Sequence, residues 1–260
     1  MLTYPNIDPV AISLGPLQVH WYGLMYLVGF AGVWILGKKR AEKPWSPVKP
    51  EAIEDLVTYG AIGVILGGRL GYILFYNLSE FLNDPTIIYK IWLGGMSFHG
   101  GMLGVFVAMW LFAKKQHCTM LQLTDIISPL APIGLGAGRI GNFINAELWG
   151  RTTDVPWAMV FPNAGPLPRH PSQLYEALLE GVGLFVILWI YTDKPRPTMA
   201  ATGLAVMLYG CFRFFVEFYR MPDAHLGYLA LDWVTMGQIL SAPMIVIGAL
   251  MFYWAHRKAA

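Results

Sequence analysis

Charged side chains are scarce in this sequence. Only 13% of the 260 residues are Asp, Glu, Lys or Arg, whereas a soluble domain carries about 25%. Apolar residues make up 56% of the chain, and the mean hydropathy is +0.49. The net charge of +2 and the lack of a basic tail give no sign of nucleic-acid binding. These shortages exclude an ordinary soluble domain and indicate an integral membrane protein.

The sequence also lacks the signatures of a metal site and of a cleaved signal peptide. Cys118 lies in a short basic loop and Cys211 inside an apolar run, so we expect the two thiols not to pair. Neither thiol has a second ligand at the spacing of a metal site. The first 18 residues contain no lysine or arginine and therefore no basic n-region. We expect the membrane segments themselves to direct insertion.

Seven apolar runs each approach the ~20 residues that a helix needs to cross a bilayer. Helices are expected because lipid cannot satisfy the polar groups of an open backbone. The sequence therefore predicts an all-α polytopic membrane protein, a single domain over residues 1–260. Pro129 and Pro132 predict a kink in the fourth span. The predicted spans cover residues 19–37, 56–76, 91–113, 121–140, 173–191, 199–218 and 236–256.

The distribution of basic residues predicts the orientation of these spans. The segments after the first, third, fifth and seventh spans hold eleven lysines and arginines, against four on the other side. Because cytoplasmic loops carry the excess of such residues, we expect the N-terminus outside and the C-terminus in the cytoplasm. The longest outer loop, residues 143–171, is then predicted to form a small extracytoplasmic cap between helices four and five.

This orientation brings the unusual polar residues of five spans to one depth. Tyr22, Arg69, His99, Arg139 and Arg213 all fall in the outer half of the bilayer. Residues that only fix helix packing have no reason to share a depth. The common level therefore indicates a functional site.

Arg139 ends the fourth apolar run together with Asn142, which lies on the same helix face. A guanidinium keeps its charge and needs a partner where an apolar span ends. Glu147 follows where the apolar pattern stops, with Asn145 between them. The alternative is that Arg139 extends to the interface and only anchors the helix. The clustering favours a site for an anionic ligand that carries hydroxyl groups.

Two glycine-rich stretches suggest further site residues. His99 follows the glycines at residues 94–95 at the start of the third span, where backbone N–H groups favour anions. An imidazole there can accept a proton near neutral pH, although a histidine at the water surface is the plain alternative. The glycines around Arg69 predict a close helix–helix seam. For Arg69 itself, a supporting and a purely structural role stay open.

Tyr209, Arg213 and Glu217 form a stripe on one face of the sixth span. Arg213 and Glu217 can pair, and a structural ion pair is the alternative to a functional role. Arg139 and Arg220 share this depth, so we expect an excess of positive charge that a lipid phosphate would balance.

The fifth span opens with residues 170–176. Ser172 is its predicted N-cap, while His170, Gln173 and Glu176 are candidates to line the cap.

The stretch from Gly138 to Gly150 reads Gly-Arg-Ile-Gly-Asn-Phe-Ile-Asn-Ala-Glu-Leu-Trp-Gly. It resembles the signature of the prolipoprotein diacylglyceryl transferase family. The resemblance covers nearly the whole chain and implies seven spans in a bacterial inner membrane, with the N-terminus outside and the C-terminus in the cytoplasm. Further matching motifs lie at residues 20–23, 99–101, 170–176, 209–217 and 236–238.

The family moves the diacylglyceryl group of phosphatidylglycerol to the lipobox cysteine thiol that follows the signal-peptide apolar region of a prolipoprotein. A thioether forms and glycerol phosphate is released, the first step of bacterial lipoprotein maturation. The resemblance implies these two substrates and membrane lipids as partners, and no nucleic acid, metal or organic cofactor. By motif, Arg139 and Arg213 are the essential arginines. The residues that assist them are Tyr22, His99, Asn142, Glu147, Gly150, Tyr209 and Glu217.

Two other functions use the same features. A transporter for anionic lipids would use the same arginines, but should show inverted repeats and broken helices at mid-depth. No repeat stands out in this sequence. A membrane scaffold would use its arginines only to pair with glutamates. The growth of negative charge on a departing glycerol phosphate favours the enzyme, because paired arginines stabilise that charge.

Overall fold

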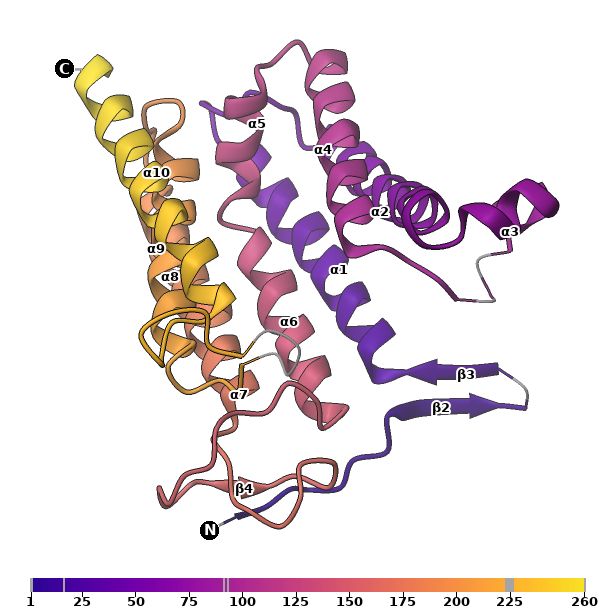
Figure 1. The fold of residues 1–260 in the computed structure, drawn as a ribbon. Helices are drawn as coiled ribbons and strands as arrows, with labels where there is room; N and C mark the ends of the chain where they lie inside the picture. Colours follow the sequence, from indigo (N-terminus) through magenta and orange to yellow (C-terminus); the bar gives the residue numbers. More distant parts are fainter. Residues whose placement is uncertain (1, 16, 91, 93, 223–226, 260) are drawn as a thin grey trace. The chain divides into compact units, whose positions relative to one another are not determined.

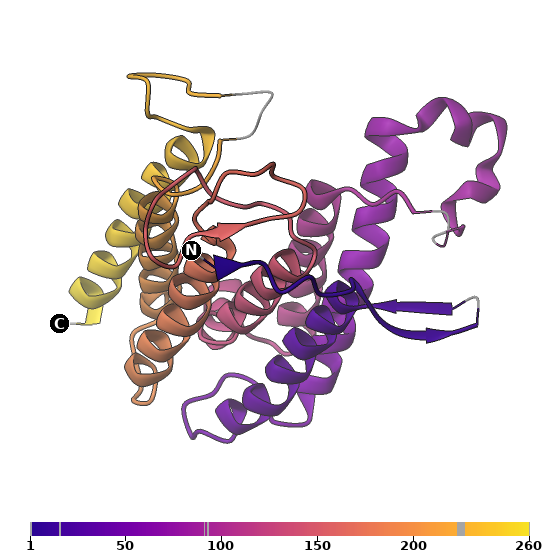
Figure 2. The ribbon, with the colours of Figure 1, turned by 90° about the horizontal axis from the view of Figure 1, so that it is seen from below.

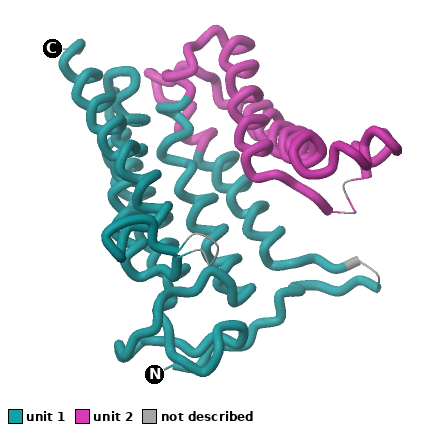
Figure 3. Tube along the Cα trace, viewed as in Figure 1, with its two compact units in different colours: residues 1–36, 124–260 teal, residues 37–123 magenta. Residues whose placement is uncertain are grey.

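The computed structural model describes residues 2–15, 17–90, 92, 94–222 and 227–259, and most of them are helical (Figure 1). The chain divides into two compact units (Figure 3). The first comprises residues 1–36 and 124–260, and the second comprises residues 37–123. Helices α1 (Trp21–Ala41) and α5 (Met120–Ile127) each contain a unit boundary.

Among the described residues, three helices are long and apolar enough to cross a membrane, or four if one bent pair forms a single span. The bent pair is α5 with α6 (Ala131–Ile144), and its two parts meet at an angle of 51°. Pro129 lies in the break and Pro132 in the first turn of α6, where the predicted kink falls. The protein is therefore a mostly helical membrane protein. The three single helices are Ala52–Tyr76, Ser172–Tyr191 and Met236–Lys258.

The unit of residues 37–123 is organised by a glycine seam between two helices. Its elements are α2 (Ala52–Tyr76), α3 (Leu78–Asn83), η1 (Pro85–Ile88) and α4 (Phe98–Lys115). Gly63 and Gly67 of α2 face Gly100 and Gly104 of α4. A Cβ atom at Gly104 would lie 2.0 Å from the carbonyl oxygen of Gly63. The backbones of α2 and α4 can approach this closely only without side chains, as the sequence predicts.

The seam makes a testable stability prediction. We expect Gly67→Ala to destabilise the protein by about 1–3 kcal/mol, because its Cβ would lie 2.4 Å from the carbonyl oxygen of Gly100. Gly60→Ala on the same helix is the matched control, since its Cβ meets nothing within 4 Å. Alanine favours a helix by about 1 kcal/mol over glycine, so the control should be neutral or stabilising. Thermal unfolding in detergent compares the two, and equal melting temperatures would contradict the seam.

Arg69 holds the segment that precedes α4. Its guanidinium donates to the carbonyl oxygens of Gly94 at 2.5 Å, Gly95 at 3.1 Å and Lys90 at 3.1 Å, and also to that of Ile87. Arg69 is buried, and its two terminal nitrogens donate to these four backbone carbonyl oxygens, while no described residue accepts from its Nε. Of the two roles that the sequence left open, this arrangement supports the structural one.

Helix α4 starts later than the predicted third span. The span was expected from residue 91, whereas the helix begins at Phe98. Gly94 and Gly95 both have φ of +79°, a left-handed conformation that interrupts a helix. Ser97 then caps α4, because its Oγ accepts a hydrogen bond from the Gly100 N–H at 3.2 Å. The start of α4 is therefore set by Gly94, Gly95 and the Ser97 cap, and not by the beginning of the apolar run.

The unit of residues 1–36 and 124–260 contains two small sheets and the remaining helices (Figure 2). The N-terminal strand β1 (Leu2–Thr3) pairs in parallel with β4 (Met159–Val160), and β2 (Val10–Leu14) pairs in antiparallel with β3 (Leu17–His20). The helices after α6 are α7 (Ser172–Glu176), the π-helical η3 (Ala177–Gly183), α8 (Leu184–Tyr191), α9 (Ala200–Val216) and α10 (Met236–Ala259).

The N-terminus packs against the loop that follows α6. Tyr4, Ala146 and Phe161 form a small buried core there. The Tyr4 hydroxyl donates to the carbonyl oxygens of Phe143 at 2.8 Å and Ile144 at 2.7 Å. Burial raises the pKa of Tyr4, so the hydroxyl keeps its proton and stays a donor at neutral pH. These contacts hold the end of α6 and the beginning of residues 143–171 in place.

Candidate functional site

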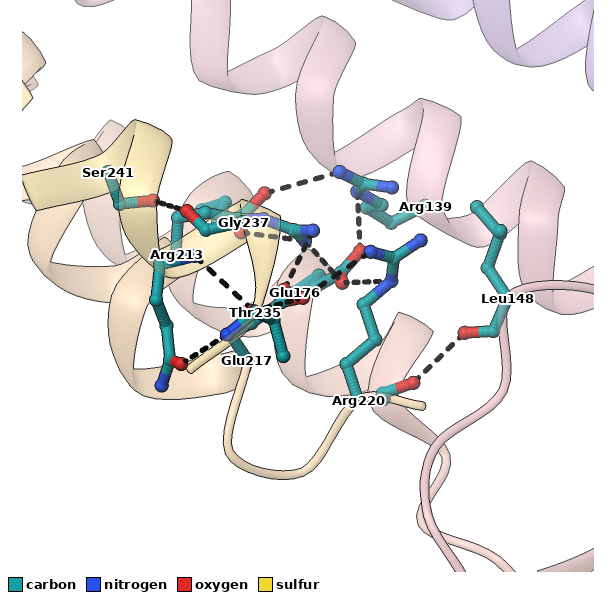
Figure 4. A network of polar contacts seen from close by, with 12 residues as sticks. Arg139, Leu148, Glu176, Arg213, Glu217, Arg220, Thr235, Gly237 and Ser241 are labelled. Atoms are coloured by element: carbon teal, nitrogen blue, oxygen red, sulfur yellow. Dashed lines mark hydrogen bonds and ion pairs between the residues drawn. The ribbon is translucent and has the colours of Figure 1, made fainter. Parts of the chain in front are cut away.

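Three arginines and three glutamates meet inside the unit of residues 1–36 and 124–260. Figure 4 labels the three arginines and two of the glutamates, Glu176 and Glu217. The six side chains come from α6, from the continuous helical segment α7–η3, and from α9 with the residues that follow it. Arg139 lies on α6, Arg213 on α9, and Arg220 in the segment after α9. The carboxylates of the cluster are Glu176 on α7, Glu180 on η3 and Glu217 at the end of α9.

Two glycines bring α6 and η3 close enough for this meeting. A Cβ atom on Gly181 would lie 2.7 Å from the Cα of Gly136, so no larger residue fits at this crossing. Arg139 follows Gly136 by one turn, and Glu180 directly precedes Gly181. The backbone crossing therefore places the guanidinium beside the carboxylate.

Glu176 bridges the two arginines of the predicted site. Its Oε2 lies 2.7 Å from Nε of Arg139, and its Oε1 accepts a hydrogen bond from Nη1 of Arg213 at 2.7 Å. The Glu176 side chain is only 1% exposed, while those of Arg139 and Arg213 are 20% and 13% exposed. The bridge fixes the spacing of the two guanidiniums and leaves each with a partly open face.

Glu217 completes the grip on Arg213. Its Oε2 lies 2.8 Å from Nη2 of Arg213, so the pair that the sequence predicts at four-residue spacing is confirmed. Thr235 donates to the other carboxylate oxygen at 3.0 Å. A Cβ atom at Gly237 would lie 2.6 Å from the carboxyl carbon of Glu217, so glycine is needed where α10 begins. The contact explains why a glycine stands in the motif at residues 236–238.

Glu180 differs from the other two carboxylates. The side chain is fully buried, and neither oxygen has a hydrogen-bond partner in the described part of the chain. The nearest cations are Nη2 of Arg139 at 3.7 Å and Nη1 of Arg213 at 3.9 Å. Glu180 sits in a π-helical turn, a feature often found at functional sites. The sequence analysis missed it, although its four-residue spacing from Glu176 inside an apolar span was a usable signal.

The expected excess of positive charge is therefore wrong. Arg139, Arg213 and Arg220 face three carboxylates, so the cluster is neutral when all six groups are ionised. The sequence analysis counted only Glu217 against the three arginines, and Glu176 and Glu180 supply the two further negative charges. Among the described residues, no group of His, Cys, Asp and Glu has the arrangement of a metal site.

The Asn142–Glu147 pair lies on the same stretch as Arg139. Nδ2 of Asn142 donates to Oε1 of Glu147 at 2.8 Å, and Nε2 of Gln173 donates to the Glu147 carbonyl oxygen at 2.5 Å. Asn145 contributes a longer bond of 3.4 Å to the same carboxylate oxygen. Glu147 is therefore held by amides, while Arg139 pairs with Glu176.

Tyr22, Gly150 and Tyr209 lie in the same unit as the cluster. The Tyr22 ring packs on Gly141, where a Cβ would lie 2.7 Å from Cδ2 of the ring. Gly150 donates its N–H to the carbonyl oxygen of His170 at 2.9 Å and forms a bridge with Arg220. Tyr209 lies one turn before Arg213 on α9. These residues belong to the surroundings of the cluster rather than to its ion pairs.

Ser172 does not cap the fifth span as the sequence predicts. Pro171 occupies the N-cap position, and the Ser172 hydroxyl instead donates to the carbonyl oxygen of Leu148 at 3.0 Å. The serine therefore ties α7 to the stretch after α6. That contact joins residues 24 positions apart, so local helix rules do not reveal it.

His99 belongs to the other unit. The residue lies in the first turn of α4, where it is exposed and contacts the ring of Phe98 edge-on, with the two ring centroids 5.6 Å apart. Of the predicted site residues, Arg213 and Glu217 pair directly, and Arg139 joins them through Glu176 in the same unit. His99 lies at the exposed start of a helix in the other unit.

The arrangement suits an anionic ligand. Two guanidiniums with partly open faces offer donors in a planar fork that matches phosphate or carboxylate oxygens. The carboxylates that now occupy these donors hold the guanidiniums in position until an anion competes for them. Burial in low dielectric strengthens each of these contacts relative to water.

Comparisons with known proteins give a family match over most of the chain. A model of the prolipoprotein diacylglyceryl transferase family matches residues 9–254. A phosphatidylglycerol–prolipoprotein diacylglyceryl transferase from Pseudomonas paraeruginosa is 62% identical over 260 residues, which cover 100% of this chain and 98% of that protein. A protein of the same name from Oleidesulfovibrio alaskensis is 61% identical over 99% of this chain and 97% of its own length. Another from Azotobacter vinelandii is 60% identical over 100% of this chain and 98% of its own length.

Proposed function

The chain belongs to the prolipoprotein diacylglyceryl transferase family, and we infer that it transfers the diacylglyceryl group of phosphatidylglycerol to the lipobox cysteine of a prolipoprotein. A thioether forms between the cysteine sulfur and the glyceryl carbon, and glycerol phosphate leaves. The full-length identity to proteins named for this reaction carries the conclusion. The roles given below to single residues rest on the geometry of the cluster.

Arg139 and Arg213 bind the phosphate of phosphatidylglycerol in this proposal. The bridge through Glu176 supports it, because it holds both guanidiniums at a fixed spacing with open faces. The lipid phosphate carries one negative charge, and the departing glycerol phosphate approaches two. Two preorganised cations stabilise the later charge more than the earlier one, which lowers the barrier.

In this proposal, the remaining motif residues of the same unit bind the lipid head group or surround the two arginines. The amide of Asn142 and the carboxylate of Glu147 offer a donor and acceptors suited to the two head-group hydroxyls. Tyr22, Gly150 and Tyr209 shape the space around the arginines. Glu217 orients Arg213 from the side of α10.

His99 is the proposed acceptor for the thiol proton. The free thiol is a weak nucleophile with a pKa of about 8.5, so attack requires loss of the proton. The open position of His99 at the start of α4 supports access by a substrate. The alternative is that His99 only hydrogen-bonds the head group.

His99→Gln separates these two roles. If His99 accepts the proton, the variant should lose most of the transfer rate and the fall in activity toward acidic pH, because glutamine cannot take a proton in this range. Phosphatidylglycerol binding should be nearly unchanged, since both arginines remain. Transfer is measured against pH at saturating lipid. A variant with the wild-type pH profile and weaker lipid binding would assign His99 to the head group instead.

Transfer itself is tested with a synthetic lipobox peptide, the purified protein and phosphatidylglycerol. The expected product is a peptide whose mass rises by one diacylglyceryl group, with one glycerol phosphate released per peptide. A cysteine-to-serine peptide is the control, because its hydroxyl is a far weaker nucleophile than a thiolate. Lipid movement between leaflets without a mass shift would favour a transporter.

The finer membrane arrangement is also a proposal. Seven spans in a bacterial inner membrane, with the N-terminus outside, the C-terminus in the cytoplasm and residues 143–171 as an outer cap, agree with the distribution of basic residues. Helices α1, α4 and α9 supply the spans beyond those that length and hydropathy identify. The cluster then lies toward the outer side, which is where a secreted precursor presents its cysteine.

Cysteine labelling tests this orientation. With Cys118 and Cys211 replaced by serine, we expect Asn163→Cys to react with a membrane-impermeant maleimide added to intact cells, and Glu42→Cys to react only after permeabilisation. Both positions are exposed in the structure, so burial does not explain a negative result. Labelling in the opposite order would place the cluster toward the cytoplasm.

A further inference from the structure

Glu180 is the one carboxylate of the cluster whose environment is incomplete. Glu176 and Glu217 each accept short contacts of 2.7–2.8 Å from guanidiniums, whereas both oxygens of Glu180 lie at least 3.7 Å from one. The side chain is fully buried, and no described residue donates a hydrogen bond to it. A buried carboxylate without donors is costly to keep ionised, and in the free protein the two guanidiniums at 3.7 and 3.9 Å offset that cost.

The groups that face Glu180 balance its charge only in the absence of a ligand. Arg139 on α6 and Arg213 on α9 are the nearby cations, and Glu176 on α7 and Glu217 are the nearby carboxylates. Tyr209 on α9 also faces it, as a neutral phenol that is a potential donor. Arg220 pairs with Glu176 and Glu217 and completes three positive charges against three negative ones.

A bound phosphate disturbs this balance. Phosphatidylglycerol brings one negative charge to Arg139 and Arg213, and the neutral cluster becomes an anion inside the protein. An uncompensated buried charge is strongly unfavourable, so the site gains from the loss of one carboxylate charge. Protonation at Glu176 or Glu217 would weaken short ion pairs that position the arginines. At Glu180 it breaks no hydrogen bond.

We propose that Glu180 takes up one proton when the phosphate of phosphatidylglycerol binds to Arg139 and Arg213. Lipid binding and proton binding are then linked at this residue. Because the complex holds one proton more than the free protein, a lower pH favours the complex. The proposal rests on the proposed function for the identity of the lipid. It assigns Glu180 as a positioning residue that pairs with the arginines in the free protein and, once protonated, does not repel the phosphate.

Proton uptake on binding is the direct test. Calorimetry of the purified full chain with short-chain phosphatidylglycerol, without prolipoprotein, is run in buffers of different ionisation heats. We expect close to one proton taken up per lipid bound, and an affinity that rises up to tenfold for each unit that the pH falls. Short-chain diacylglycerol, which has no phosphate, should bind without proton uptake.

Variants identify the residue that takes the proton. Glu180→Gln is neutral and nearly isosteric, so it should bind phosphatidylglycerol without proton uptake and with an affinity independent of pH. Glu42→Gln, at an exposed position in the other unit, should behave as wild type. Persistent uptake in Glu180→Gln, or its loss in His99→Gln, would overturn the assignment to Glu180.

Three further results bear on the proposal even if Glu180→Gln fails to fold. Wild-type binding of phosphatidylglycerol without proton uptake would overturn the linkage and leave the proposed function intact. Equal uptake with diacylglycerol would show that the proton does not respond to phosphate, and would also overturn it. Failure of phosphatidylglycerol to bind at all would overturn the proposed function and this inference together.

Discussion

Arg139→Ala and Arg213→Ala should each lower diacylglyceryl transfer by at least about a hundredfold. Loss of one donor group from a preorganised anion site costs about 3 kcal/mol or more in the transition state. Both guanidiniums share Glu176 as a partner, so the loss of either also removes one of the short contacts that hold the Glu176 carboxylate between them. The release of glycerol phosphate from phosphatidylglycerol with a lipobox peptide measures the effect.

Lysine at either position should fail as well. A lysine ammonium carries the charge but not the planar fork that grips two phosphate oxygens. Arg257→Ala is the matched control, because Arg257 is exposed near the end of α10 and lies outside the cluster. Comparable expression and melting temperature show that the variants fold. Near-wild-type release of glycerol phosphate by folded Arg139→Ala or Arg213→Ala would rule out their assigned role.

Glu176→Ala should have the largest effect on stability. The change removes a carboxylate that is 1% exposed and leaves Arg139 and Arg213 without the partner they share. Removal of one partner from a buried ion pair costs about 3–5 kcal/mol, because the remaining charge stays buried and uncompensated. We expect a large fall in the melting temperature in detergent, together with loss of transfer because the arginines lose their spacing.

A surface pair gives the comparison for Glu176. Glu54 pairs with Lys38 at 2.5 Å, but its side chain is 60% exposed. Glu54→Ala should change stability by only about 0–1 kcal/mol, since water screens the pair and solvates the remaining lysine. Both variants remove one carboxylate from a short ion pair, so burial is the main difference between them. Equal melting temperatures would show that the Glu176 bridge is not the stabilising contact that its geometry indicates.

The sequence by itself determined the class of this protein and one contact of its charged cluster, the pair of Arg213 and Glu217. Membrane insertion depends on local composition, so apolar runs of about 20 residues identify helices without any knowledge of their neighbours. The kink at Pro129 and Pro132 and the Arg213–Glu217 pair are equally local, since they depend on residues at most four positions apart. The order of motifs along the chain was sufficient for the resemblance to a family.

Only the tertiary structure decided how the charges of the site are balanced. Glu176 and Glu180 reach Arg139 because Gly136 and Gly181 let two backbones cross closely, and a crossing between distant segments leaves no periodic pattern in the sequence. For the same reason, the sequence does not predict that Tyr4 packs against residues 143–171. It also does not predict the partners of Arg69, because these are backbone carbonyl oxygens, which every residue type carries. Local physics sets which residues are helical and charged, whereas the approach of distant backbones sets which of those charges meet.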